Sequence, residues 1–255
     1  MKWSFDQNKE KETLLGELYH QNSTHAPMLQ MITAPRRRYM ITSSDSQQYE
    51  NELLSTDLMT EKESAHTLSY TLKNRKTSWA FSSEDMTLND LRHLFTYSFG
   101  LRDKQELSRT YPAGGKFYPL EIYFVPTKRT IENGLLESAV YKYNVDSDKI
   151  VKIKNTELGN INQLTAATDV GFFSFDQAQI LIFLVNNSKE MEVKYMSLAY
   201  RLVLLEAGHM AQNFLLMATD MGISSVPIGG FHEKRVNELL GLEEGKQTMY
   251  LLLGG

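Results

Sequence analysis

Hydrophobic and polar positions follow recognisable periods from about residue 87 to the end of the chain. Thr87–Gly100 begins with a hydroxyl residue, has an acidic residue three positions later, and then carries apolar residues at helical spacing. This pattern predicts a capped amphipathic helix that ends at Gly100. Two continuous apolar runs, Leu120–Val125 and Gln179–Val185, predict buried strands, the first stopped by Pro126.

Residues 138–145 and 149–153 alternate around an Asp-Ser-Asp turn, which suggests a hairpin. The pattern further predicts a short helix over residues 158–168, a loop over 224–231, an amphipathic helix over 232–242 and a C-terminal strand over 247–255. A long helix is expected from about Met196 to Met221, ended by Gly222. Its apolar residues cover most of its circumference, so it should be central or lie between subunits. This mixed order of strands and helices predicts an α+β fold.

The first part of the chain differs from the rest. Residues 1–70 are polar and weakly periodic. We therefore expect an N-terminal extension over residues 1–70 that packs on a main domain over residues 71–255.

Composition then excludes several classes of function. The 255 residues include 27 basic and 31 acidic side chains, a net charge of −4, which argues against nucleic acid as a partner. The chain has no cysteine, so disulfides and thiolate metal sites are excluded. No two histidines have metalloprotease spacing, and we expect no metal site. The most apolar segment, Ala199–Met221, is interrupted by charges, so we expect a cytoplasmic protein without a membrane partner.

Three short segments are suited to a flat phosphorylated ligand. Arg75, Lys76 and Thr77 place two cations and a hydroxyl side by side, which suits a phosphate. Residues 112–119 and 224–231 are glycine-containing loops stiffened by proline, and glycines allow a ligand to approach the backbone closely. Taken singly, each segment is better explained as an ordinary turn or a solvated charge pair.

In this order and spacing, the three segments resemble the nitroreductase superfamily of flavin mononucleotide (FMN) enzymes, over about residues 72–253. The resemblance implies a mixed central sheet flanked by helices, with the long helix at a homodimer interface. The FMN site would lie between the subunits. The chain departs from the family pattern at Trp79, where a cation is usual, and at Ala113, where serine is usual.

The resemblance also implies which residues bind FMN. The expected cofactor-binding residues are Arg75, Lys76, Thr77, Arg109, Pro112, Ala113, Gly114, Gly115, Lys116, Pro227, Ile228, Gly229 and Gly230. Of these, the backbone N–H of Gly229 would face flavin N5.

Longer matches resemble one branch, the SagB-type or thiazole/oxazole-forming dehydrogenases. They are Tyr19-His20-Gln21-Asn22-Ser23, residues 109–123, residues 194–213 and residues 227–242, with Leu198 where the branch has arginine. Such enzymes oxidise thiazolines and oxazolines in ribosomally made peptides, of bacteriocin or toxin type, after a cyclodehydratase has closed the rings. The implied partners are therefore a peptide substrate and a cyclodehydratase complex.

The branch's catalytic Lys-Tyr motif matches Lys194 and Tyr195. From the residues alone, the pair could be a surface lysine and a packing tyrosine at the start of a helix. Adjacent residues point apart on a regular helix, so we expect the pair in a loop or first turn before the long helix. Glu206, His209 and Asn213 lie within that helix, and we expect them to form a hydrogen-bond network between helices or subunits.

Two other functions stay open on the sequence. The first is a generic NAD(P)H-dependent nitro- or quinone reductase, which would have no special need for Lys194. The second is a non-catalytic scaffold of the modification complex, because Trp79, Ala113 and a chain that ends at Gly255 without a basic tail all weaken the expected flavin site.

Overall fold

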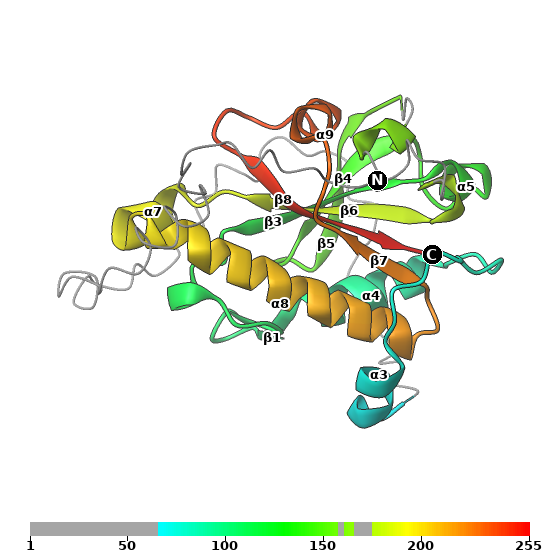
Figure 1. The fold of residues 1–255 in the computed structure, drawn as a ribbon, viewed down its shortest axis with the longest axis horizontal. Helices are drawn as coiled ribbons and strands as arrows, with labels where there is room; N and C mark the ends of the chain where they lie inside the picture. The colour runs from blue at the N-terminus through cyan, green and yellow to red at the C-terminus, as the bar shows by residue number, and fades with distance from the viewer. Residues whose placement is uncertain (1–65, 158–160, 166–174) are drawn as a thin grey trace, which may run out of the picture.

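The fold is built around one central sheet. In the computed structural model, residues 66–157, 161–165 and 175–255 are described. Six strands form the sheet in the order β5-β4-β3-β6-β8-β7 (Figure 1). Their bounds are β3 Leu120–Pro126, β4 Ala139–Asn144, β5 Lys149–Asn155, β6 Ile180–Asn186, β7 Ser225–Ile228 and β8 Gln247–Gly254. A separate two-stranded sheet pairs β1 (Leu101–Asp103) with β2 (Ser108–Arg109).

The remaining elements are helical. The α-helices are α3 Leu68–Asn74, α4 Leu88–Phe99, α5 Lys128–Glu132, α7 Lys189–Tyr195, α8 Leu198–Asp220 and α9 Glu233–Leu240. Short 3-10 turns are η2 Gly114–Lys116, η3 Ile161–Leu164 and η4 Phe175–Gln177. No helix in the described ranges is long and apolar enough to cross a membrane.

The sequence correctly placed most of these elements. Helix α4 begins with the predicted capping box, in which Thr87 and Asp90 satisfy each other's backbone N–H groups. The two apolar runs became β3 and β6, which lie side by side in the middle of the sheet. Such runs lack alternation because the strands are buried on both faces, as the burial pattern of β6 shows at every position. The hairpin β4–β5 is also confirmed.

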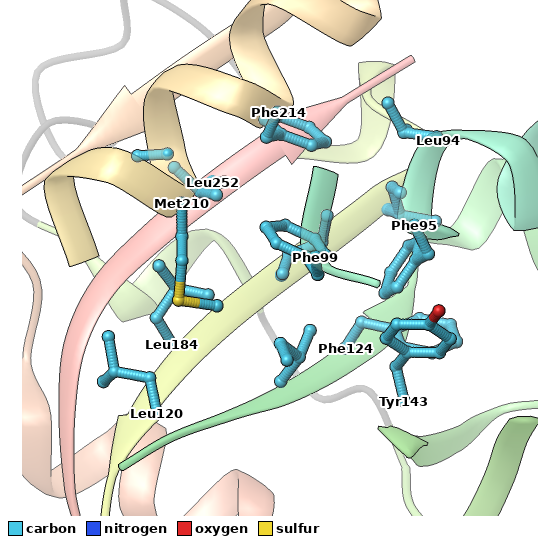
Figure 2. Packing of buried hydrophobic residues seen from close by; sticks show 14 of the residues in the cluster. Leu94, Phe95, Phe99, Leu120, Phe124, Tyr143, Leu184, Met210, Phe214 and Leu252 are labelled. Carbon is cyan, nitrogen blue, oxygen red and sulfur yellow. The ribbon is translucent and has the colours of Figure 1, made fainter. Parts of the chain in front are cut away.

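Both faces of the sheet are covered. Helices α4 and α8 pack on one face, where their aromatic and aliphatic side chains meet those of the strands (Figure 2). Figure 2 shows this layer through Phe95, Phe99, Met210 and Phe214 above Phe124 and Leu184. On the other face, Val236 and Leu240 of α9 pack with Tyr123, Val125 and Phe183. Two apolar layers therefore hold the sheet in place.

Four expectations need correction or lie outside the described residues. All five pairings in the large sheet are antiparallel among the described strands, so its strand directions are not mixed. The predicted loop 224–231 contains β7, because Ser225–Ile228 pairs with β8 along the edge of the sheet. Of the predicted helix 158–168, η3 is described and the rest is not. Residues 1–65 of the predicted extension also lie outside the described residues.

Candidate functional site

The glycine loop before β3 packs against the junction of α7 and α8. A Cβ at Gly114 would lie 3.0 Å from both Leu202 Cδ1 and Met191 Cε. Gly115 has φ +65° and lies beneath Tyr195, where a Cβ would be 2.6 Å from the hydroxyl oxygen. Only glycine meets both demands at position 115, the left-handed backbone and the close approach of the phenol. Contacts within the chain therefore already favour glycine at position 115, whereas a Cβ at position 114 would need the ends of two flexible side chains to shift.

Lys194 and Tyr195 lie at the C-terminal end of α7, facing this loop. The Tyr195 ring meets the Phe117 ring edge-on, with 5.8 Å between the centroids. The Lys194 ammonium nitrogen is 5.9 Å from the Phe117 centroid and 5.3 Å from that of Tyr195. Both side chains are half-buried. The pair therefore shares one aromatic surface, although its members are adjacent in the chain.

The local backbone differs from our expectation for this pair. The pair was expected in a loop or first turn before a helix starting at Met196, but it ends a separate helix, α7. Met196 then breaks the chain with φ 49° and ψ −131°, an unusual conformation for a residue with a side chain. The break lets α8 leave in a new direction at Leu198. No sequence signal marked it, because methionine is not a helix-breaking residue.

The second group of predicted residues surrounds the start of β7. The Ser78 N–H donates to the Ser225 carbonyl at 3.2 Å, and Ser224 Oγ lies 3.4 Å from Ser78 Oγ. This pairing fixes the segment that carries Arg75, Lys76 and Thr77 beside the edge of the sheet. Arg75 is half-buried, Lys76 and Thr77 are exposed, and neither cation forms an ion pair within the described part of the chain.

The glycines after β7 leave the backbone accessible. A Cβ at Gly229 or Gly230 would meet nothing within 4 Å. Pro227 and Ile228 are held within β7 by pairing with Leu252 and Leu251. These features fit FMN: two uncompensated cations and a hydroxyl suit its phosphate, and an open glycine backbone suits the edge of a flat ring.

The Lys194–Tyr195 pair with the loop 112–116 lies at one end of α8. The segment 75–77 and the start of β7 lie at the other. The loop 112–116 contacts Leu202 in the first turns of α8, whereas β7 begins five residues after the helix ends at Asp220. A helix of 23 residues is about 35 Å long at 1.5 Å per residue. In Figure 1, α7 lies at one end of α8, and α3 and β7 lie near the other. One FMN therefore cannot contact both the Lys194–Tyr195 pair and the cations at residues 75 and 76 of one chain.

Arg109 and Lys116, two further residues expected to bind the cofactor, both contact side chains of the protein itself. The Arg109 side chain is mostly buried, pairs with Asp146 at 3.7 Å and donates to the Tyr111 hydroxyl at 3.0 Å. Burial by itself would lower the pKa of Arg109, but the neighbouring Tyr111, Asp146 and Glu206 raise it overall. Lys116 is exposed and lies 3.8 Å from Glu106. Their expected contacts with a phosphate stay predictions.

Glu206 is a buried carboxyl group of α8, which the sequence predicted to take part in a hydrogen-bond network. It is 1% exposed, and neither carboxylate oxygen has a hydrogen-bond partner of ordinary geometry within the described residues. Burial raises the pKa of Glu206 to about 8, although Arg109 and the Leu120 N–H favour the charged form. The described residues of one chain thus show no side-chain network at Glu206, and a network between subunits stays a prediction. Asn213, in contrast, donates to the carbonyls of Ser98 and Thr110, and His209 is exposed.

Two pockets lie along α8, one of them next to the Lys194–Tyr195 pair. An open pocket of about 400 Å³ lies where α7 meets α8, lined by Glu192, Met196, Ser197 and Tyr200, next to the Lys194–Tyr195 pair. A second, of about 340 Å³, lies between α3, α4 and α8 and is lined by none of the predicted site residues. The described residues contain no cluster of three or more groups that could hold a metal ion. Phe117, which both members of the pair contact, lies within the predicted loop 112–119 but was not itself among the predicted site residues.

Comparison with known proteins agrees with this fold. Residues 72–255 match the nitroreductase family, and the chain belongs to that family. A putative nitroreductase, MJ1384, from Methanocaldococcus jannaschii is 32% identical over 173 residues, covering 68% of this chain and 83% of that protein. The microcin B17-processing protein McbC from Escherichia coli is 24% identical over 162 residues, covering 62% of this chain and 58% of that protein.

Solved structures show the same fold. A putative nitroreductase from Ralstonia eutropha JMP134 matches with a TM-score of 0.64 and 19% identity, over 80% of this chain and 92% of that chain. The E. coli microcin synthetase McbBCD complex with truncated pro-MccB17 matches with a TM-score of 0.61 and 17% identity, over 94% of this chain and 91% of that chain. The expected α+β, nitroreductase-like fold is therefore confirmed, and membership of the family indicates an oxidoreductase.

Proposed function

We propose that this protein is an FMN-dependent dehydrogenase that oxidises thiazoline or oxazoline rings in a ribosomally made peptide to thiazoles or oxazoles. The observation that carries the proposal is the placement of Lys194 and Tyr195 together against Phe117 and Gly115. A reductase that takes electrons from NAD(P)H has no need of an amine and a phenol there. The similarity to McbC, and to the McbBCD complex with its bound pro-peptide, also favours a peptide substrate.

The reaction removes two electrons and two protons from the ring. Bound FMN would accept the hydride equivalent. Lys194 is the base that takes the acidic proton from the ring carbon next to the peptide carbonyl. Tyr195, whose hydroxyl is held over the backbone of Gly115, orients the ring and exchanges a proton with the lysine. The half-buried rings of Phe117 and Tyr195 limit the access of water to the amine.

A homodimer would bring the two halves of the site together. If the α8 helices of two copies pack antiparallel, the loop 112–116 of one copy meets Arg75, Lys76 and Gly229 of the other. The surface of α8 suits such packing, since Leu204 and Leu205 are 42% and 54% exposed beside exposed Gly208. A pair of apolar helices with a small residue between them is a common subunit contact.

The test is reconstitution with FMN, a thiazoline-containing peptide and a partner cyclodehydratase. We expect each ring to lose two hydrogens by mass spectrometry, in proportion to the flavin-loaded enzyme. An intact thiazoline after many equivalents of active flavoprotein would contradict the proposal. The cytoplasmic location expected from the sequence stays a prediction, as do the peptide substrate and the cyclodehydratase partner.

A second candidate is an NAD(P)H-dependent nitro- or quinone reductase. It is favoured by the 32% identity to a putative nitroreductase. Stopped-flow measurement separates the two functions: rapid bleaching of the flavin by NAD(P)H, unchanged in Lys194→Ala, supports the reductase. A protein that purifies colourless and binds no FMN in a fluorescence titration would instead favour the non-catalytic scaffold.

A further inference from the structure

Arg109 connects the two ends of the glycine loop. Its guanidinium carbon lies 4.5 Å from the centroid of the Tyr118 ring, and its Nη1 donates to the Tyr111 hydroxyl at 3.0 Å. Its main-chain N–H donates to the Tyr118 hydroxyl at 3.3 Å. The two tyrosine rings meet edge to face, 5.8 Å apart. Because Tyr111 precedes the glycines of the loop and Tyr118 follows them, one arginine holds the chain on both sides of Gly114 and Gly115.

The charge of Arg109 is compensated from outside the loop as well. Asp146, in the turn between β4 and β5, pairs with it at 3.7 Å. Glu206 of α8, whose pKa burial raises to about 8, is a second neighbour that adds negative charge only when it is deprotonated. The side chain is only 11% exposed. A flat guanidinium can stack on a ring and donate in its plane at the same time, which a lysine ammonium cannot do. This arrangement suits an internal support better than a phosphate contact.

The loop itself needs support. Gly115, Lys116 and Tyr118 have φ values of 65°, 59° and 49°. Two of these residues are not glycine, and a side chain in the left-handed region is unfavourable unless the surroundings hold it there. The same loop carries Gly115 beneath Tyr195, and Phe117 against Tyr195 and Lys194. Any relaxation of the loop therefore moves the surface on which the pair rests.

We infer that Arg109 is a positioning residue that clamps residues 110–118, and so holds Phe117 and Gly115 against Lys194 and Tyr195, rather than a ligand of the FMN phosphate. The inference rests on the proposed function where it treats Lys194 and Tyr195 as the catalytic pair. The clamp itself can be tested without flavin.

The first test compares Arg109→Lys with Arg102→Lys. Arg102 is 67% exposed and lies in the neighbouring strand β1, so its variant controls for the same chemical change made at an exposed position. Amide hydrogen exchange is measured in the purified full chain without flavin. We expect exchange at residues 113–118 to rise by about tenfold or more in Arg109→Lys and to stay unchanged in Arg102→Lys, because local opening governs exchange. Equal rates in the two variants would overturn the clamp.

A milder variant, Tyr118→Phe, keeps the test decisive if Arg109→Lys does not fold. Tyr118→Phe keeps the ring under the guanidinium and removes only the hydroxyl that accepts the Arg109 N–H. We expect a smaller rise in exchange over the same residues. If Arg109→Lys does not fold, this variant decides alone: a rise supports the clamp and wild-type rates overturn it.

The second test distinguishes positioning from phosphate binding. FMN and riboflavin differ by the phosphate, so their affinities are compared in wild type, Arg109→Lys and Arg75→Ala. We expect Arg109→Lys to weaken both flavins by the same factor and to lower turnover at saturating FMN, with a thermal midpoint close to that of Arg102→Lys. Arg75→Ala should weaken FMN alone. Loss of FMN affinity alone in Arg109→Lys would overturn the inference. A wild-type protein that binds neither flavin would contradict the proposed function, while the exchange result would still decide the clamp.

Discussion

The hydroxyl of Tyr195 lies directly over the backbone of Gly115, so close that a Cβ there would be 2.6 Å from the oxygen. This contact joins the C-terminal end of α7 to the loop before β3, although the two residues are far apart in the sequence. It fixes the phenol of the proposed catalytic pair relative to the loop that is proposed to contact the flavin. The position of Tyr195 therefore depends on the absence of a side chain at residue 115.

Replacing Gly115 with alanine should displace Tyr195. A left-handed backbone costs a residue with a Cβ roughly 1–2 kcal/mol, and the clash with the phenol adds to it. Gly134→Ala is the matched control, because Gly134 has φ +76° and open space around it. We expect Gly115→Ala to lower the thermal midpoint more than Gly134→Ala and to lose most turnover. Equal losses in the two variants would show that the Tyr195 contact has no effect.

Lys194→Ala should separate flavin binding from chemistry. The amine contacts the rings of Phe117 and Tyr195 and lies in the half of the site without Arg75 and Lys76. We expect the variant to bind FMN as tightly as wild type and to lose azoline oxidation by a factor of about 100 or more, the usual contribution of a general base. Lys189→Ala, an exposed lysine at the start of the same helix, should keep its activity. Retained oxidation in Lys194→Ala would remove the lysine from the mechanism.

Mixing two inactive variants should restore activity. In an interfacial site, Arg75 and Lys76 of one copy serve the Lys194 of the other. A mixed dimer of Arg75→Ala/Lys76→Ala with Lys194→Ala then contains one intact site and one doubly damaged site. After random exchange of subunits, roughly a quarter of the wild-type activity should return, since half of the dimers are mixed. If subunit exchange is complete and activity stays at the level of the separate variants, the two groups do not meet across an interface, and the interfacial site is contradicted.

Glu206 should make the stability of the protein depend on pH. Burial raises its pKa from 4.5 to about 8, so the folded protein holds a proton on this carboxyl that the unfolded chain releases. The free energy of unfolding should therefore decrease as the pH rises from 4.5 to about 8, by a few kcal/mol at most, at about 1.4 kcal/mol per pKa unit. Below pH 4.5 the carboxyl is protonated in both the folded and the unfolded state, so it no longer makes the free energy of unfolding depend on pH.

The variant Glu206→Gln isolates this carboxyl. The amide copies the protonated form and cannot ionise, so denaturation in urea should show a smaller decrease in stability between pH 5 and 8 than in wild type. At pH 8 the variant should be the more stable protein. If the two proteins lose stability in parallel over this range, the carboxyl is not a source of the pH dependence.

Much of the fold could be predicted from local patterns. The apolar runs of β3 and β6, the capping box of α4 and the end of α8 near Gly222 were all readable because each depends on residues close in sequence. The strand β7 was missed, because Ser225–Ile228 contains a proline and forms a strand only through its pairing with β8. The break at Met196 was missed for a similar reason, since the packing of α7 and α8 against the loop sets its backbone.

For the candidate site too, some features follow from the sequence and others only from the tertiary structure. The sequence by itself determined its chemistry: two cations and a hydroxyl at residues 75–77, accessible glycines at 229 and 230, and an amine next to a phenol at 194 and 195. Only the tertiary structure decided which of these lie together. It seated the Lys194–Tyr195 pair on Phe117, surrounded Arg109 with internal partners and placed the cations at the far end of α8. Distances between residues remote in the sequence are set by packing on the sheet, which no local pattern of side chains encodes.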